Sequence, residues 1–524
     1  MNRDEMLKRI RRREKEWDII VVGGGATGLG TAIDAASRGY QVLLIEQSDF
    51  AKGTSSRSTK LVHGGVRYLQ QGNISLVLEA LKERGLMRRN APHLVHNLPF
   101  VVPTYDWWEG PFYGIGLKVY DMLAGRHGFG HSKGLSREKT LAFIPTLEPK
   151  GLRGGVIYYD GQFDDARLAV NMVRTAVEQG ATVVNYLRAE ALVKSEGMVR
   201  GVTARDAESR EAYTLAAKVV VNAAGVFADA LRRMDDPEAP GIITPSQGVH
   251  IVLDKSFMPG DTAIMVPHTD DGRVLFAIPW KNRVVVGTTD TEMEETPLDP
   301  CPLPEEIDFL LSHAARYLTR DPKREDILSA FAGLRPLVSL GGHENTAAIS
   351  RDHALTLSRS GLLTITGGKW TTYRKMAEDT VDQAVVLAQL QERPCVTRDL
   401  NIHGYHQNAA QFGHLSVYGS DAVVIQALLA EEPRLAVPLH PDHPYLEGEV
   451  VWAVRHEMAR TVEDFLARRR RVLIVDARAS MEMAPRVARL MALELGRDRG
   501  WESEQVSVYE ALARGYLGDG VCPA

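Results

Sequence analysis

Hydrophobic and polar positions alternate between strand-like and helix-like patterns in residues 18–46. An apolar run of strand length ends at Val22, and a second one covers residues 41–45. Between them, small and apolar residues recur with helical spacing to about Ser37, and Gly39 ends that helix. A strand, a helix and a second strand in this order predict a βαβ unit.

Glycines mark the turn between the first predicted strand and the helix. Gly23, Gly25 and Gly28 form a G-x-G-x-x-G sequence. Such glycines allow a tight turn, a close approach of a pyrophosphate and close packing of helix on strand. The helix N-terminus then faces the diphosphate with free N–H groups. Glu46, 21 residues after Gly25, is placed to accept the ribose hydroxyls. We therefore predict a dinucleotide site; the alternative is a glycine-rich turn in an ordinary α/β protein.

The same patterns predict further elements along the chain. Apolar residues at helical spacing predict helices at residues 75–90, 165–178, 303–320 and about 371–390. Branched and aromatic runs predict strands at residues 181–185, 218–222 and 362–366, and an antiparallel sheet within residues 246–292. Residues 400–524 carry helical patterns, such as those at 450–470 and 481–495.

Changes in composition divide the chain into an α/β protein of three domains. Prolines, tryptophans and glycines in residues 98–125 mark the start of a second domain, and the strand ending at Asn222 returns to the first. We predict a Rossmann-like dinucleotide-binding domain made of residues 17–90, 150–245 and 345–392. The predicted antiparallel-sheet domain has residues 91–149 and 246–344, and a helical domain has residues 395–524.

Composition and charge narrow the function classes. The chain has 524 residues, of which 44% are hydrophobic and 25% charged, as in a soluble globular protein. A net charge of −5 excludes nucleic-acid binding by overall charge. No apolar run approaches the roughly 18 residues of a membrane span. Cys301, Cys395 and Cys522 lie far apart, which argues against a disulfide framework or a zinc site and suits a reducing compartment.

Two basic stretches invite more than one interpretation. Residues 1–16 hold seven Lys or Arg and lack an apolar core, so they predict a solvated helix rather than a signal peptide. Contact with anionic lipid is the alternative for this helix. Residues 468–471 are four consecutive arginines, which we call the arginine run. We expect the arginine run to form a solvated helix face.

Two glycine-rich segments carry candidate chemistry. Residues 53–69 are dense in Gly, Ser and Thr, whose backbone and hydroxyl groups can line a ligand. We expect this segment to line the cofactor and to reach the reacting centre at His63, Arg67 and Tyr68; the alternative is a surface loop. Residues 362–374 form a strand, a double-glycine turn and a threonine-capped helix start. That helix N-terminus can face an anion, such as the edge of a reduced flavin.

These motifs together resemble one family, the membrane-associated, quinone-reducing FAD-dependent glycerol-3-phosphate dehydrogenases. That family lies within the wider group of flavoproteins like D-amino-acid oxidase. The matching stretches cover the chain from about residue 17 to 390: residues 23–28, 53–69, 164–167, 278–280, 287–290, 333–336 and 367–374. The related glycerophosphate oxidases carry an insertion that this sequence lacks, which favours a dehydrogenase.

The resemblance implies FAD bound by the first domain, a substrate domain over the flavin and a helical C-terminal domain peculiar to the family. It places Arg67, Tyr68, Arg335, Arg351 and Lys369 in the substrate pocket, and His63 and His250 near the flavin. We expect the cofactor to be bound by Gly23, Gly25, Gly28, Glu46, Thr54, Ser55, Ser56, Thr59, Lys60, His63, Gly64, Gly225, Gly368, Lys369 and Thr371.

The implied reaction is oxidation of sn-glycerol 3-phosphate at C2 to dihydroxyacetone phosphate. Arginine suits the phosphate because its guanidinium is a permanently charged fork of donors. A general base needs a pKa near the working pH, which fits His250 or His63. Lys369 would stabilise negative charge that develops on the flavin. Catalysis is thus assigned to His63, His250, Arg335 and Lys369.

The resemblance also implies partners and a location. We expect a membrane quinone as electron acceptor, peripheral attachment to the cytoplasmic face of the cell membrane, and a homodimer. The N-terminal helix and the arginine run are candidates for the attachment. Three rival functions remain: an oxygen-using glycerophosphate oxidase, another flavin oxidase of the same fold, and a flavoprotein that holds FAD without catalysis.

Overall fold

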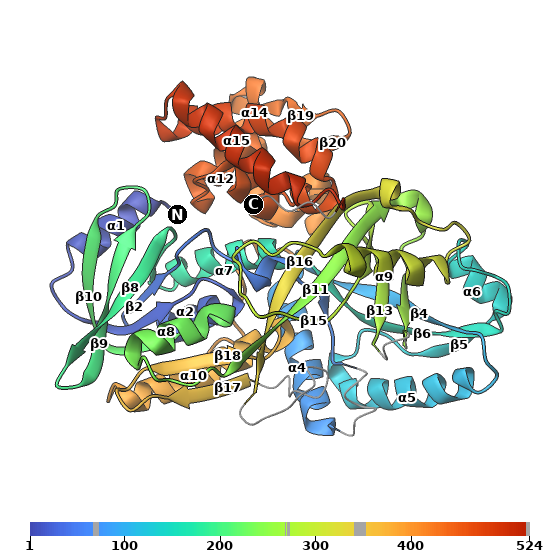
Figure 1. Ribbon diagram of the computed structural model, residues 1–524, viewed down its shortest axis with the longest axis horizontal. Coiled ribbons are helices and arrows are strands. Elements are labelled where there is room, and N and C mark those ends of the chain that lie inside the picture. Colours follow the sequence, from blue (N-terminus) through green and yellow to red (C-terminus); the bar gives the residue numbers. More distant parts are fainter. Residues whose placement is uncertain (66–72, 268, 270–272, 340–352, 520–524) are drawn as a thin grey trace.

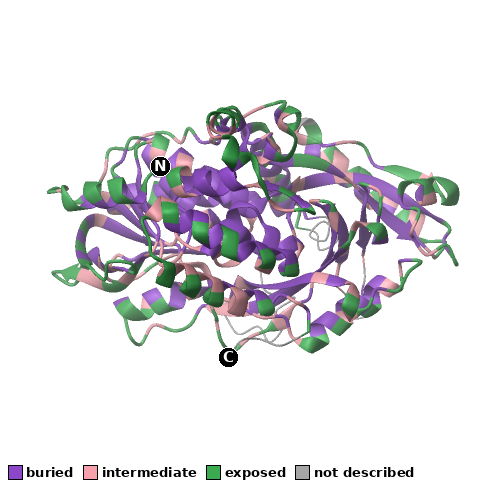
Figure 2. Ribbon diagram, turned by 90° about the horizontal axis from the view of Figure 1, so that it is seen from above, coloured by how far each residue is buried: buried purple, intermediate pink, exposed green. Residues whose placement is uncertain are grey.

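The fold consists of two sheets side by side, with a helical domain above the place where they meet (Figure 1). The computed structural model describes residues 1–65, 73–267, 269, 273–339 and 353–519. Residues near the N-terminus contribute to the first sheet, and residues 421–514 form most of the helical domain. Figure 2 shows buried residues running through the whole length of the molecule, with exposed residues on the outer helices.

The first sheet has five neighbouring parallel strands in the order β18-β10-β1-β2-β7. The predicted βαβ unit is confirmed as β1, the helix α2 (Ala26–Ser37) and β2. The strands of this sheet are β1 (Trp17–Val22), β2 (Val42–Ile45), β7 (Thr182–Val184), β8 (Leu187–Ser195), β9 (Met198–Asp206), β10 (Ala212–Asn222), β17 (His353–Leu357) and β18 (Leu363–Gly367).

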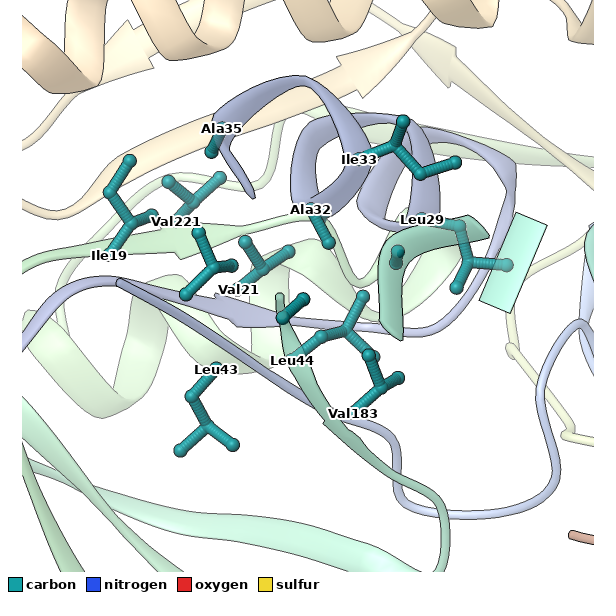
Figure 3. Close-up of a cluster of buried hydrophobic side chains, with 14 of the residues drawn as sticks. Ile19, Val21, Leu29, Ala32, Ile33, Ala35, Leu43, Leu44, Val183 and Val221 are labelled. Atoms are coloured by element: carbon teal, nitrogen blue, oxygen red, sulfur yellow. The ribbon is translucent and has the colours of Figure 1, made fainter. Parts of the chain in front are cut away.

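The core of the first domain lies where α2 packs on these parallel strands (Figure 3). Leu29 and Ala32 of α2 belong to one buried cluster with Val21 of β1, and all three are fully buried. Each leucine or valine buried in this way stabilises the fold by about 1.5–3 kcal/mol. Because β1 and β2 are covered on both faces, residues 19–22 and 42–45 are apolar throughout instead of alternating.

Helices cover both sheets and connect their strands. The predicted helices at residues 75–90 and 165–178 are confirmed, and the one at residues 303–320 is shorter than predicted. The helices before the C-terminal domain are α1 (Arg3–Arg11), α2, α4 (Ile74–Asn90), α5 (Glu109–Ala124), α6 (Arg137–Phe143), α7 (Asp165–Glu178), α8 (Ala228–Asp235), α9 (Pro304–Ala315) and α10 (Tyr373–Leu387).

The second sheet is mostly antiparallel, as the branched and aromatic runs predict. One strand pair in it, β4 with β12, is parallel. Its strands are β3 (Leu61–Val62), β4 (Val95–Thr104), β5 (Lys133–Ser136), β6 (Gly154–Phe163), β11 (Ile243–Asp254), β12 (Ala263–Val266), β13 (Leu275–Trp280), β14 (Arg283–Gly287), β15 (Thr291–Glu292) and β16 (Ile327–Val338). β6 belongs to this second sheet, although the sequence predicts that residues 150–245 belong to the dinucleotide-binding domain. The domain boundaries remain predictions.

The C-terminal domain is helical, with one small two-stranded sheet. The helical pattern of residues 450–470 does not form one helix: α12 ends at Glu457, and a π-helical segment covers Asp464–Arg469. The elements of this domain are α11 (Asp421–Glu431), β19 (Pro438–His440), β20 (His443–Leu446), α12 (Glu447–Glu457), α13 (Val472–Val475), α14 (Ala477–Leu495) and α15 (Arg499–Arg514).

Two predictions about charge and cysteine are wrong. The arginine run is not solvated, because its four side chains are between 0% and 3% exposed. Cys301 is disulfide-bonded, so the expectation of reduced cysteines fails there, whereas Cys395 is a free thiol.

Two further features bear on membrane contact. The N-terminal helix α1 exists as predicted, yet it buries Met6, Leu7 and Ile10. Within the described ranges, no helix combines the length and apolar character needed to cross a bilayer.

Candidate functional site

The glycine turn after β1 forms one wall of an elongated cavity, which we call the cofactor cavity. Gly23 has φ +116°, and a Cβ there would lie 2.4 Å from the carbonyl oxygen of Ala223. A Cβ on Gly28 would lie 1.9 Å from the carbonyl oxygen of Gly23. No side chain fits at either position, so the turn keeps its backbone open to a ligand, as a pyrophosphate site requires.

Glu46, directly after β2, hydrogen-bonds to this turn. Its carboxylate accepts hydrogen bonds from the N–H groups of Gly24, at 2.6 Å, and Ser48, at 2.9 Å. Burial raises the pKa of Glu46, and these two N–H groups act in the opposite direction. Glu46 also lines the cofactor cavity, where its oxygens can accept hydrogen bonds from the ribose hydroxyls.

The rest of the cofactor cavity comes from segments far apart in the sequence. The N–H of Ala26, at the start of α2, donates to the Ser55 hydroxyl at 2.9 Å, so not every N–H of this helix end is free. Trp370 Nε1 donates to the Ser55 carbonyl at 2.9 Å, which ties Ser55 to the segment that follows the double-glycine turn. The predicted cofactor residues that line the cavity are Gly23, Gly25, Glu46, Thr54, Ser55, Gly225, Gly368 and Lys369.

A second cavity, of about 170 Å³, adjoins the first and is lined by Thr59, His63 and Arg335. The two cavities are close together, because Pro336 lines the cofactor cavity and its neighbour Arg335 lines the second one. We call this smaller space the second cavity.

Arg335, on β16, is the best-defined cation of the second cavity. Its Nη1 lies 3.2 Å from the Asp290 carboxylate, and its Nη2 donates to the Thr288 hydroxyl at 3.0 Å and the Thr289 carbonyl at 2.9 Å. The side chain is 23% exposed. These contacts fix the plane of the guanidinium, so its charge is preorganised at the cavity wall.

The two candidate histidines have different surroundings. His63 lines the second cavity, and its backbone N–H donates to the Thr371 hydroxyl at 3.3 Å. His250 is 2% exposed, stacks on Phe331 and hydrogen-bonds through Nε2 to the Thr59 hydroxyl at 3.0 Å. Burial, and secondarily the charges of Lys60 and Arg335, lower the pKa of His250 well below its usual value. His250 is therefore a neutral group behind Thr59.

Several predicted cofactor residues line neither cavity. Lys60 is buried and donates to the Ser56 carbonyl at 2.9 Å and to Asp165 at 2.7 Å. Burial lowers the pKa of Lys60 to about 7, although Asp165 opposes this. The N–H of Gly64 donates to the Tyr120 hydroxyl at 2.7 Å. Lys60, Ser56 and Gly64 thus fix the backbone of residues 56–64 through contacts within the protein.

Three predicted substrate residues, Arg67, Tyr68 and Arg351, lie outside the described residues. The structure adds others that the sequence does not single out. Asp160 lines the second cavity and accepts hydrogen bonds from Tyr120 at 2.9 Å and from Arg84. Arg273 lines the same cavity. The local signal for Asp160 is a carboxylate that directly follows the apolar and aromatic residues 156–159 of β6.

Comparisons with known proteins agree with this geometry. Residues 18–374 match the family model "FAD dependent oxidoreductase", and residues 359–505 match "C-terminal domain of alpha-glycerophosphate oxidase". The chain is 40% identical to a probable mitochondrial glycerol-3-phosphate dehydrogenase of Caenorhabditis elegans, over 98% of this chain and 75% of that protein. It is also 40% identical to the mitochondrial glycerol-3-phosphate dehydrogenase of Homo sapiens, over 94% of this chain and 72% of that one.

A solved structure is similar over the full length of the chain. The glycerol-3-phosphate dehydrogenase from Bacillus halodurans, complexed with FAD, has 31% sequence identity and a TM-score of 0.81. The alignment covers 100% of this chain and 99% of that one. The open glycine turn, the acid at the end of β2 and the double-glycine turn fit FAD. The chain belongs to the FAD-dependent glycerol-3-phosphate dehydrogenases.

Proposed function

We propose that this enzyme oxidises sn-glycerol 3-phosphate at C2 to dihydroxyacetone phosphate and passes the electrons to a membrane quinone. The observation that carries the proposal is the small second cavity, with Arg335 and His63 on its wall, beside a cavity that fits FAD. Bound FAD supplies a two-electron acceptor for the hydride that leaves C2. The protein's own residues then have to hold the phosphate and remove the proton of the 2-hydroxyl.

Arginines are the natural ligands for the phosphate. Arg335 offers a fixed guanidinium, and Arg273 lines the same cavity. Asp290 also contacts Arg335 at 3.2 Å, so a bound phosphate would share this cation with a carboxylate. We therefore assign the phosphate to Arg335 together with Arg273, and we retain Arg67, Tyr68 and Arg351 as predicted contributors.

Removal of the proton of the 2-hydroxyl needs a general base within hydrogen-bond reach, and the two histidines are the predicted candidates. His63 fits best, because it lines the second cavity, whereas His250 reaches that cavity only through the Thr59 hydroxyl. The lowered pKa of His250 also makes its ring a weak base. Lys369 lines the cofactor cavity and remains the predicted electrostatic stabiliser there.

Substitution of the two histidines separates their roles. We expect His63→Asn to lower kcat by roughly 100-fold or more, because a positioned base contributes about 10²–10⁴-fold. His250→Asn should have the smaller effect, since it acts through Thr59. Steady-state kinetics as a function of pH measures both, with His131→Asn, at an exposed position, as the control. A larger loss in His250→Asn than in His63→Asn would reverse the assignment.

The electron acceptor can be identified directly. The enzyme should reduce a soluble quinone analogue with glycerol 3-phosphate as donor and produce little hydrogen peroxide in air. Stoichiometric peroxide and no quinone reduction would instead establish an oxidase. Oxidation of glycerol as fast as glycerol 3-phosphate would argue against a phosphate site.

The helix α5 offers a surface for the membrane. Large apolar side chains lie exposed along one face of it, and their spacing of three and four residues brings them into one stripe. They are Trp108, Phe112, Ile115, Val119 and Met122, with exposed fractions of 44%, 51%, 67%, 39% and 80%. Apolar and aromatic residues in such a stripe are typical of helices that lie in a membrane interface.

The stripe on α5 replaces the arginine run as a candidate for attachment and adds to the N-terminal helix, whose Lys8 and Arg11 stay exposed. The arginine run is buried, and α1 turns its apolar residues inward. We expect Ile115→Glu combined with Met122→Glu to abolish flotation of the enzyme with liposomes, because each substitution places a charge in the apolar stripe. Val508→Glu, at an exposed apolar residue of α15, is the control. Full flotation of the double variant would exclude α5 as the attachment surface.

This stripe supports contact with a membrane surface, and the cytoplasmic face of the cell membrane is proposed from the family resemblance. A homodimer is also proposed from the family resemblance. Light scattering on the detergent-solubilised enzyme measures the oligomeric state.

A further inference from the structure

The arginine run connects the C-terminal domain to the first domain, and the proposed reaction does not use it. Guanidinium groups are seldom as buried as these unless they are paired. Arg470 pairs within its own domain, with Glu449 at 3.0 Å. Arg468, Arg469 and Arg471 instead reach partners more than 300 residues away in the sequence.

The first of these partners is Asp49, just after β2. Its carboxylate is fully buried and accepts hydrogen bonds from Arg468 Nε and from both Nη atoms of Arg469, one of them at 2.9 Å. Arg468 also pairs with Asp464 at 2.7 Å, and Arg469 donates to the Glu457 carbonyl at 2.7 Å. Asp49 is thereby anchored to the C-terminal domain by two arginines.

The second partner is the segment that begins at Ser56. Arg471 Nη2 donates to the Ser56 carbonyl at 2.6 Å and to Asp165 at 2.9 Å. The other oxygen of Asp165 accepts from Lys60 at 2.7 Å and from the Ser58 hydroxyl at 2.7 Å. Arg471 itself has φ +66°, a conformation uncommon for a residue other than glycine. A left-handed residue therefore carries the guanidinium that completes this buried cluster.

Asp49 and Ser56 lie on either side of one segment that lines the cofactor cavity. Residues 51–55, which we call the cofactor loop, all line that cavity. Thr59 and His63, which follow Ser56, line the second cavity. The arginine run thus holds the chain at both ends of the cofactor loop and just before the residues of the second cavity.

We propose that the C-terminal domain acts as a clamp on the cofactor loop, and that Arg471 is a positioning residue for FAD, Thr59 and His63. A loop of small residues loses conformational freedom when it orders around a ligand, and anchoring its two ends beforehand reduces that loss. For its effect on catalysis the inference rests on the proposed function, whereas its effect on FAD binding does not depend on the substrate.

Arg471→Lys in the full-length enzyme tests the clamp. Lysine keeps the positive charge, but its single ammonium cannot reproduce the fork that contacts Ser56, Asp165 and the Ala467 carbonyl. We expect the FAD dissociation constant to rise about tenfold or more, as for the loss of a hydrogen bond to a charged group. We expect kcat to fall on the order of 10- to 100-fold through misplacement of the reacting groups, with KM nearly unchanged.

Two further variants make the outcome decisive. Asp49→Asn keeps the shape of the side chain but weakens both arginine contacts, so it should also weaken FAD binding. This variant provides the test if Arg471→Lys fails to fold. Arg486→Lys, which alters a half-exposed pair with Glu447 in the same domain, should leave FAD affinity and kcat unchanged. Wild-type FAD affinity in folded Arg471→Lys or in Asp49→Asn would overturn the clamp. FAD affinity is measured without substrate, so it decides this even if glycerol 3-phosphate proved not to be oxidised.

Discussion

Gly28→Ala is expected to yield a protein without bound FAD and without activity. The added methyl group would lie 1.9 Å from the Gly23 carbonyl oxygen, so the start of α2 must move away from the turn. Overpacking of this kind costs about 1–3 kcal/mol or more. This displacement moves the backbone that approaches the pyrophosphate. We therefore expect FAD affinity to fall by more than the free energy of unfolding. Absorbance in the flavin bands, relative to that at 280 nm, measures the occupancy.

Gly30→Ala is the matched control in the same helix. Its methyl group would lie 2.9 Å from Cδ2 of the buried Tyr373 and 3.3 Å from the Tyr373 carbonyl oxygen and the Ala377 Cβ, and neither residue lines the cofactor cavity. This variant should keep its yellow colour and lose only some thermal stability. Full FAD occupancy in folded Gly28→Ala would show that the turn does not hold the dinucleotide as proposed.

Arg335→Ala is expected to lower kcat/KM for glycerol 3-phosphate by about 30-fold to several thousand-fold. Truncating one partner of a buried charged contact costs about 2–5 kcal/mol, and each 1.4 kcal/mol is tenfold in affinity. Most of the loss should appear in KM, because the phosphate is bound equally in ground and transition states. FAD should stay bound, since Arg335 does not line the cofactor cavity.

Two comparisons separate lost phosphate binding from general damage. Arg335 also holds Thr288 and Thr289, so some loss of stability is expected alongside the kinetic effect. If the arginine binds phosphate, turnover of unphosphorylated glycerol should change far less than that of glycerol 3-phosphate. Arg320→Ala, at an exposed pair with Asp326, should leave both unchanged. Equal losses with the two substrates would remove Arg335 from phosphate binding.

The cofactor site could be predicted from sequence because its determinants are local. Gly23 and Gly28 lie within six residues of each other, and the requirement for glycine follows from the backbone itself. The double-glycine turn before Lys369 could be predicted for the same reason, since both its glycines have positive φ. Local geometry of this kind leaves a signature in the residue types.

The clamp could not be predicted because its partners are distant in the sequence, whereas His63 and Arg335 of the second cavity could be predicted through the glycine-rich segment and the family resemblance. Arg471 meets Asp165 across 306 residues, and Arg469 meets Asp49 across 420. A run of four arginines has no local feature that indicates burial, since charged side chains are mostly solvated. The stripe on α5 could not be predicted for the opposite reason: large apolar and aromatic residues usually indicate a core, and here the tertiary structure leaves them exposed.

Anaerobic titration of the purified enzyme with sn-glycerol 3-phosphate tests the central claim most directly. The account predicts that the flavin absorbance bleaches on addition of the substrate and that one dihydroxyacetone phosphate forms for each flavin reduced. A quinone analogue should then restore the yellow colour. A flavin that stays oxidised in the presence of glycerol 3-phosphate, in a preparation fully loaded with FAD, would contradict it.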